Sequence, residues 1–198
     1  MWVDMSDSGG GRIMHSTNDF DVDVAVAAAS YIAQRAPGRL GMHELAKLLY
    51  FADREHLTRY GRMIVGDYYV KMDYGPVPSA VYDGIKAAAR PDDEVKRSFI
   101  GPELADAFIE AFEVNNGHKS ITSKAEPDMD QLSESDVECL DWALEQFQGA
   151  SFGRLTEVSH GPAWTAAMKH GPLDVMEIAE ENDASEEVLQ HLADPYPG

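Results

Sequence analysis

The chain has 198 residues, of which 44% are apolar and one is a cysteine. This length fits one domain with a sizeable core and argues against a second full domain, while the single Cys139 excludes an internal disulfide and any zinc site that needs several thiolates. Acidic residues outnumber basic ones by 35 to 16, for a net charge of -19, which disfavours direct binding to the phosphates of DNA or RNA.

The negative charge is concentrated in the last third of the chain. Residues 126–198 hold 17 of the acidic residues and two of the basic ones, Arg154 and Lys169. Such a surface would steer a basic protein partner toward it, although solubility alone is the alternative interpretation of the same excess. No apolar run approaches the length of a membrane span and no secretory signal pattern is visible, so a soluble cytoplasmic protein without membrane contact is predicted.

The first third of the chain predicts two helices between less regular segments. Residues 1–18 lack apolar periodicity and are predicted to be disordered. Asn18 or Asp19 is expected to cap a helix over 22–35. A second helix over 42–59 has an apolar stripe, which leaves Lys47 and Arg54 facing outward; the stripe consists of Leu45, Leu48, Leu49 and Ala52.

A turn-rich segment follows the second helix. Apolar and aromatic residues over 62–73 predict short strands around a turn at Gly66 and Asp67. Gly75-Pro76 and Pro78 can continue neither a helix nor a central strand, so a turn is predicted there as well. Ser79 is then the expected N-cap of a helix over 80–89.

The second half predicts further short helices. A helix over 104–112 and a short hairpin over 113–124 come first. A helix from Ser133 to Phe147 follows, since Ser133 and Asp136 form a capping-box pattern. Shorter helices are predicted at 151–158, from Pro162 to about 170, and at 185–192, and residues 193–198 form a tail. The predicted fold is mainly α, in the α+β class: one compact domain over 19–192 with a small antiparallel β-hairpin or sheet.

Seven of the eight tyrosines lie between Tyr31 and Tyr82. Tyrosine is enriched among interface anchors because it combines a rigid apolar body with one polar end. Tyr68, Tyr69 and Tyr74 lie in turn-rich backbone and are the predicted partner-binding residues. Tyr50 and Tyr82 lie on or beside buried stripes and are interpreted as core residues.

Two other patterns are candidates for chemical sites. His160 precedes a predicted helix and could act as a general base, but its nucleophile would have to be a serine or Cys139, whose acidic neighbours raise its pKa. The favoured interpretation is structural, with His160 linking two helix ends and Trp164 filling the core. Asp53 and His56 are too few for a metal site, and a solvated or salt-bridged helix face is favoured. No catalytic, cofactor-binding or metal-binding residue is predicted.

Two sequence blocks carry a family resemblance. The first contains KLLYFA at 47–52, Tyr60-Gly61, GDYYVK at 66–71 and YGPVPS at 74–79; the second contains Leu132-Ser133 and LTEVSH at 155–160, followed by Trp164. Together they resemble the Panacea domain of SocA-like antitoxins and their phage-associated relatives. Ala46 departs from this pattern, since many relatives carry glutamine there, and residues 90–129 match loosely. The motif residues that the resemblance marks as structural are Tyr50, Gly75, Pro76, Pro78, His160 and Trp164.

The resemblance implies a function through protein contact. It points to the antitoxin of a type II toxin-antitoxin pair, a non-enzymatic protein that neutralises a cognate protein toxin, encoded by an adjacent gene, by binding it directly. One alternative is a proteolytic adaptor that delivers the toxin to a AAA+ protease, with residues 1–18 as a tether. Another is a small hydrolase centred on His160. No helix-turn-helix segment is evident, so DNA binding is not predicted.

Overall fold

A computed structural model of the chain describes residues 20–36, 38–115 and 120–194. The segment predicted to be disordered, 1–18, lies outside these residues. The elements in chain order are α1 (Val22–Arg35), α2 (Met42–Tyr60), β1 (Tyr69–Met72), β2 (Gly75–Pro78), α3 (Ser79–Ala88), α4 (Glu94–Ile100), α5 (Pro102–Ala111), β3 (Phe112–Asn115), β4 (Ser120–Ser123), the 3-10 turn η1 (Met129–Gln131), α6 (Glu134–Phe147), α7 (Phe152–Ser159), α8 (Pro162–Ala166), α9 (Val175–Glu180) and α10 (Glu186–Ala193). The predicted fold class, mainly helical with small antiparallel sheets, is confirmed.

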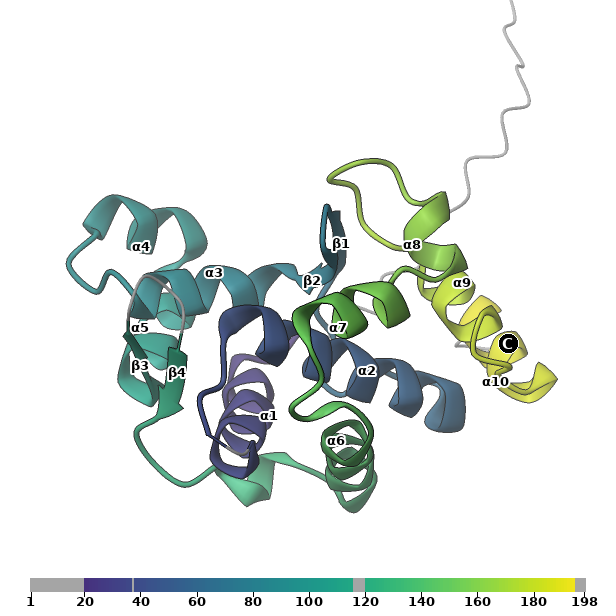
Figure 1. Cartoon of the computed structure of the whole chain (residues 1–198), viewed down its shortest axis with the longest axis horizontal. Helices are drawn as coiled ribbons and strands as arrows, with labels where there is room; N and C mark the ends of the chain where they lie inside the picture. The colour runs from purple at the N-terminus through teal and green to yellow at the C-terminus, as the bar shows by residue number, and fades with distance from the viewer. Residues whose placement is uncertain (1–19, 37, 116–119, 195–198) are drawn as a thin grey trace, which may run out of the picture.

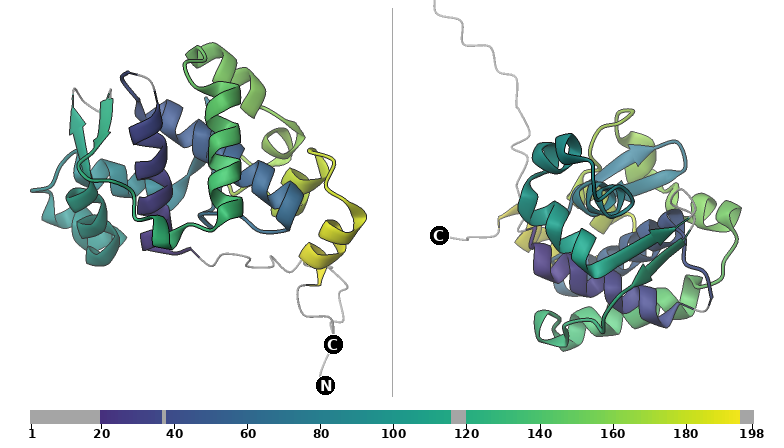
Figure 2. Two further views of the ribbon diagram at one scale, coloured as in Figure 1. Left: turned by 90° about the horizontal axis from the view of Figure 1, so that it is seen from below. Right: turned by 90° about the vertical axis from the view of Figure 1, so that its left-hand side faces the viewer.

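Helix α2 lies at the centre of the molecule, and every residue from Leu45 to Asp53 is buried. Helices α1 and α6 run side by side across one face of α2, as Figure 2 shows, while α7, α9 and the β1–β2 hairpin also pack on it. A helix that is covered on all sides buries its polar positions together with its apolar stripe. The prediction that Lys47 faces outward is therefore wrong.

The two ends of the molecule flank this centre. At one end, α3 packs on α5 and the β3–β4 hairpin, and α4 lies outermost (Figure 1). Gly84 on α3 permits this packing, because a Cβ there would lie 2.5 Å from the ring of Phe108 on α5. At the other end, α9 packs against both α8 and α10. Among the described residues, no helix is long and apolar enough to cross a membrane.

The β1–β2 hairpin differs from the prediction. Its strands are antiparallel, with Tyr69 opposite Pro78 and Met72 opposite Gly75, so the chain reverses at residues 73 and 74. The predicted turn at Gly75-Pro76 is instead a strand. Strand β1 has a second neighbour on its other side, where the backbone N–H of Leu173 donates to the carbonyl of Tyr69. Strand β2 lies at the edge, where proline is tolerated because an edge strand needs fewer N–H donors.

The helix caps follow local sequence in most places. Helix α6 has the predicted capping box of Ser133 and Asp136, and Ser151 and Ser185 cap α7 and α10. Two caps differ. Asp21 caps α1 in place of Asn18 or Asp19. Ser79 is already helical, and the carboxylate of Asp67 accepts hydrogen bonds from the first N–H groups of α3, at Ala80 (3.1 Å) and Val81 (3.0 Å).

Candidate functional site around the β1–β2 hairpin

The two sequence blocks that resemble a known family meet at the β1–β2 hairpin. Strand β2 contacts both α2, from the first block, and α7, from the second. Two α2 side chains reach the hairpin directly, Lys47 at Pro76 and Tyr50 at Tyr69. Trp164 also contacts the hairpin: its indole N–H donates to the carbonyl of Met72 at 3.1 Å. The motif residues therefore share one location.

Lys47 is a buried cation beneath strand β2. Its side chain is fully buried, and its ammonium donates to the carbonyl of Pro76 at 2.7 Å. No carboxylate of the described residues forms an ion pair with it. Burial without a counter-charge lowers the pKa of Lys47 to about 7. The pKa of nearby His43 is lowered to about 4 by its own burial and by the charge of Lys47.

Gly75 lets β2 approach both Lys47 and α7. Its φ of +98° lies in a region that side-chain-bearing residues rarely adopt. A Cβ at this position would lie 2.3 Å from the hydroxyl oxygen of Ser159 and 2.6 Å from Nζ of Lys47. Position 75 thus requires glycine for two reasons, its backbone conformation and the absence of space.

Tyr69 belongs to a buried polar network and not to the surface. Its side chain is 2% exposed, and its hydroxyl donates to Oδ2 of Asp53 at 2.7 Å. The other oxygen of Asp53 accepts from the backbone N–H groups of Ile64 and Val65. The predicted partner role of Tyr69 is therefore corrected to a structural one, and Asp53 does not lie on a solvated helix face.

Tyr50 connects α2 to the C-terminal helices. Its hydroxyl donates to Oε1 of Glu181 at 3.3 Å, while Oε2 of Glu181 accepts from the backbone N–H of Ala163 in α8 at 2.7 Å. Gly161 makes room for this carboxylate, since a Cβ there would lie 2.6 Å from Oε2. Tyr50 is 1% exposed, so its hydroxyl positions the helix that carries Trp164.

His56 lies in a separate network at the other end of α2. Its ring is buried, with Nε2 at 3.2 Å from Oδ1 of Asp136, an oxygen that also pairs with Arg62. The prediction for Asp53 and His56 was a solvated or salt-bridged helix face. Both side chains are buried, and His56 lies against the carboxylate of Asp136. Within the described part of the chain, no group of three His, Cys, Asp or Glu side chains could hold a metal ion.

His160 and Trp164 stack with their rings 3.7 Å apart and nearly parallel. The ammonium of Lys71 lies over the ring of Trp164, 4.4 Å from the ring centre, in a cation–π contact. His160 follows α7 as its C-cap, as predicted, but Trp164 is half-buried at the edge of the core. Nε2 of His160 is buried and has no hydrogen-bond partner among the described residues.

The contacts of His160 do not favour the hydrolase alternative. The hydroxyl of Ser159 donates to the carbonyl of Thr156 at 3.0 Å and so does not serve as a nucleophile paired with the imidazole. Burial raises the pKa of the Cys139 thiol to about 12, which suppresses the thiolate that catalysis would need. His160 and Trp164 instead join α7 and α8 to the hairpin.

We expect Trp164→Ala to destabilise the fold by about 2–4 kcal/mol. This loss is near or below the usual range for a buried aromatic because the ring is only partly buried, although the variant also loses the hydrogen bond to Met72. Chemical denaturation of the wild type, Trp164→Ala and Trp164→Phe measures the effect. The phenylalanine variant keeps a ring against His160 and should lose less; an unchanged midpoint for Trp164→Ala would show that the ring does not hold the hairpin.

An exposed aromatic patch covers the outer side of this hairpin cluster. It consists of Tyr74, Phe152 and His43. Tyr74 at the hairpin tip is 61% exposed and Phe152 at the start of α7 is 51% exposed. Their ring centres are 5.1 Å apart, edge to face, and Phe152 stacks on His43 at 4.1 Å. Tyr68, just before β1, is 56% exposed. Of the predicted partner residues, Tyr68 and Tyr74 are therefore accessible, whereas the contribution of Phe152 was not predicted.

The family comparison covers this site. A family model described as "Antitoxin SocA-like, Panacea domain" matches residues 45–165. The chain therefore belongs to the SocA-like Panacea-domain family, as the resemblance implied. The match begins within α2 and ends within α8, so it includes the hairpin cluster; the predicted domain limits of 19 and 192 are wider and stay a prediction. No curated protein and no solved structure gave a significant match.

Membership of an antitoxin family indicates a toxin as the general kind of partner and favours a role without catalysis. Most of the motif residues are buried. Lys47, Tyr50, Gly75 and His160 hold the hairpin and α7 in place, while the exposed rings of Tyr74 and Phe152 lie just outside them.

Proposed function

We propose that this protein is the antitoxin of a type II toxin-antitoxin pair and that it neutralises its toxin by direct binding through the aromatic patch. The observation that carries the proposal is the exposed ring pair of Tyr74 and Phe152. Both residues lie within the part of the chain that matches the family. Exposed aromatic rings with fixed orientation are typical of binding hot spots, because they bury much apolar area and lose little side-chain entropy.

The packing beneath the patch supports a preorganised binding surface. Tyr74 lies at the reversal between two paired strands, and Phe152 is the first residue of a helix capped by Ser151. The two rings contact each other edge to face, which restricts their motion. A surface that is ordered before binding avoids part of the entropy cost of association.

The acidic residues of the last third of the chain support a basic toxin. Many of them are exposed and without ion pairs among the described residues, as with Glu134, Glu145 and Glu187. Long-range attraction of this kind raises the association rate and weakens as salt increases. The adaptor alternative relied on residues 1–18 as a tether, which lie outside the described residues, and no contact in the structure favours it.

The test of this function is genetic. The reading frame next to this gene is expressed from an inducible promoter in a host that lacks both genes. Growth should stop when that frame is induced alone and should resume when this chain is co-expressed. If the neighbouring product is harmless, or if its toxicity persists in the presence of this chain, the proposed function is wrong.

We expect the double variant Tyr74→Ala/Phe152→Ala to lose rescue while remaining folded. Each ring, as a hot-spot residue, should cost about 2 kcal/mol of binding or more, and both rings are largely solvent-exposed in the free protein. The matched control is Phe99→Ala, which removes an 88% exposed phenylalanine from α4, at one end of the molecule and away from the hairpin (Figure 1). Rescue by the double variant at the wild-type level, with equal protein amounts, would exclude the aromatic patch.

A further inference from the structure

The β3–β4 hairpin is joined to the rest of the chain along one edge only. Strand β4 lies between β3 and α1 (Figure 1), and it packs on α1. The backbone N–H of Ile121 in β4 donates to the carbonyl of Leu40 at 2.8 Å, which closes the outer side of β4. Strand β3 pairs with the other side of β4. We call the side of β3 that faces away from β4 the β3 edge.

The pairing register shows which backbone groups point outward along the β3 edge. Antiparallel strands alternate between residues that exchange hydrogen bonds with their neighbour and residues that do not. The N–H of Lys124 donates to the carbonyl of Ala111, so position 111 and then positions 113 and 115 face β4. The N–H and C=O groups of Val114 therefore point away from β4. Neither group forms a hydrogen bond with any other described residue.

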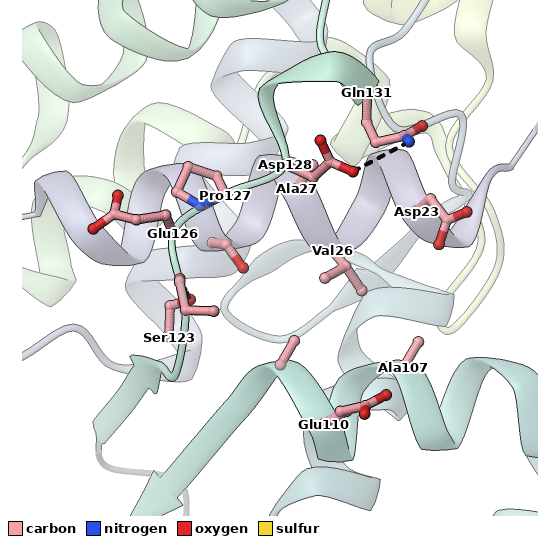
Figure 3. A pocket seen from close by; sticks show the side chains of 13 residues that line it. Asp23, Val26, Ala27, Ala107, Glu110, Ser123, Glu126, Pro127, Asp128 and Gln131 are labelled. Atoms are coloured by element: carbon pink, nitrogen blue, oxygen red, sulfur yellow. Dashed lines mark hydrogen bonds between the residues drawn. The ribbon is translucent and has the colours of Figure 1, made fainter.

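The surroundings of the β3 edge are open and contain no pocket wall. Glu113 and Asn115 are exposed, and Val114 is partly buried. A hollow of about 390 Å³ lies nearby between α1 and α5, where Ser123 of β4 borders it (Figure 3), but no residue of β3 lines it. The β3 edge is therefore suited to another extended strand, which would use the free backbone groups, and not to a compact ligand.

Strand β2, at the edge of the other hairpin, is protected against such pairing. The N–H of Ser79 donates to the carbonyl of Tyr68, so the groups that face away from β1 belong to Pro76 and Pro78. Neither proline has an N–H, and the carbonyl of Pro76 already accepts from Lys47. Proline and lysine on an edge strand keep another chain from pairing there. Strand β3 contains neither residue, so it lacks this protection.

The sequence of β3 is complementary to a second copy of itself. An antiparallel pair centred on Val114 places this residue opposite itself, where the two copies exchange both of their free backbone groups. The same register places Glu113 of each copy opposite Asn115 of the other. Carboxylate and amide are compatible neighbours: within one copy, the Asn115 amide already donates to Oε1 of Glu113 at 3.1 Å. No two like charges lie opposite each other in this register.

We infer that two copies of this chain associate through the β3 edge, as an antiparallel pair of β3 strands that joins both hairpins into one four-stranded sheet. The two-fold axis passes through the Val114 pair, so the assembly closes as a dimer and does not propagate. The paired segment is short, and the dimer is therefore weak and depends on concentration. The aromatic patch lies on the other hairpin, so the inference does not depend on the proposed function.

Sedimentation equilibrium of the full chain measures the association, and hydrogen exchange locates it. The fraction of dimer should rise with protein concentration. The amide of Val114 should exchange rapidly in the dilute monomer and slowly in the dimer, because it gains a carbonyl acceptor from the second copy. The amide of Ile121, which already donates to Leu40, is the internal control and should exchange at a rate that changes little with concentration.

Two opposite substitutions at one exposed position test the register. Asn115→Asp places a second carboxylate opposite Glu113 at both symmetric sites and should weaken the association about tenfold. Asn115→Lys places a cation there instead and should strengthen it about threefold or more. The matched control is Gln146→Glu, which adds the same negative charge at an exposed position of α6 and should associate like the wild type. Circular dichroism confirms that each variant is folded.

Cross-linking gives an independent check on the same register. Glu113→Cys and Asn115→Cys proteins, mixed and oxidised, should form a mixed disulfide-linked dimer, because the two positions lie opposite each other across the pair. The control mixture of Asn115→Cys with Thr122→Cys, an exposed position on β4, should not cross-link. The native Cys139 is buried and does not compete.

Three results would overturn the inference. The first is a chain that stays monomeric at concentrations up to about 1 mM. The second is a dimer that neither Asn115 variant changes and that forms no mixed disulfide, because its interface then lies elsewhere. The third is an amide of Val114 that the toxin protects and a second copy does not, which would make a strand of the toxin the occupant of the β3 edge.

Discussion

Gly75→Ala should destabilise the protein by about 2–6 kcal/mol, and Gly75→Val should prevent folding. Two costs add at this position. A residue with a side chain is strained at a φ of +98°, which costs about 1–3 kcal/mol, and the new Cβ would overlap Ser159 and Lys47, which costs about 1–3 kcal/mol more. Urea denaturation of the purified variants measures both changes.

Gly101→Ala is the matched control for Gly75→Ala. Gly101 has a similar φ of +93°, but no atom lies within 4 Å of a Cβ built there. Its loss of stability should therefore reflect strain alone and be smaller. Equal losses at the two glycines would show that the close approach to Lys47 and α7 is unimportant. A Gly75 variant that is stable but fails to neutralise would assign the hairpin backbone to the binding surface.

Lys47→Met should remove the rise in stability with pH that we expect of the wild type between pH 7 and 8.5. The pKa of Lys47 is about 7 in the folded protein and near its ordinary value of 10.5 in the unfolded chain, so the unfolded chain binds more protons across this range. Stability then rises with pH, by about 1.4 kcal/mol per unit at most and about 2 kcal/mol over the range. Below pH 7, the full cost of burying the charge is present.

Three of the other groups with shifted pKa values titrate outside this range. The pKa of His43 is about 4 and that of Asp67 about 6, while that of Cys139 is raised to about 12. The matched control is Lys169→Met, since Lys169 is an exposed lysine whose side chain is 71% accessible. Denaturant midpoints are compared at pH 7.0 and 8.5. If Lys47→Met keeps the wild-type slope, Lys47 is not a buried, uncompensated cation.

The longer helices could be predicted because their signals are local. The bounds of α1 were predicted to the residue, and α6 has both the capping box and the apolar periodicity that predicted it. The short helices α4 and α9 were not predicted. They have seven and six residues, which is too few for a hydrophobic period to stand out.

The hairpin and the buried charges could not be derived from local patterns. The strand character of Gly75–Pro78 depends on pairing with β1, which is itself held by residues 170–173, distant in sequence. The local pattern predicts Lys47 at the surface, because a charged residue between apolar ones usually faces solvent. Its burial follows from the hairpin and α7 covering that side of α2.

The binding surface was predictable only in part. Tyr68 and Tyr74 were identified from their position in turn-rich backbone, but the same argument selected Tyr69, which alternates to the inner side of β1 and bonds to Asp53. The period of two along a strand would have separated Tyr68 from Tyr69 if the strand limits had been known. Phe152 gave a weaker signal, a phenylalanine directly after a serine N-cap.

Direct association of the purified proteins tests the central claim most closely. The toxin from the adjacent frame is immobilised, and the wild type, Tyr74→Ala/Phe152→Ala and Phe99→Ala are passed over it at several salt concentrations. We predict a complex whose association rate falls with salt and whose dissociation rate rises at least about tenfold in the double variant alone. No measurable complex, or equal dissociation rates for all three proteins, would contradict binding through the aromatic patch.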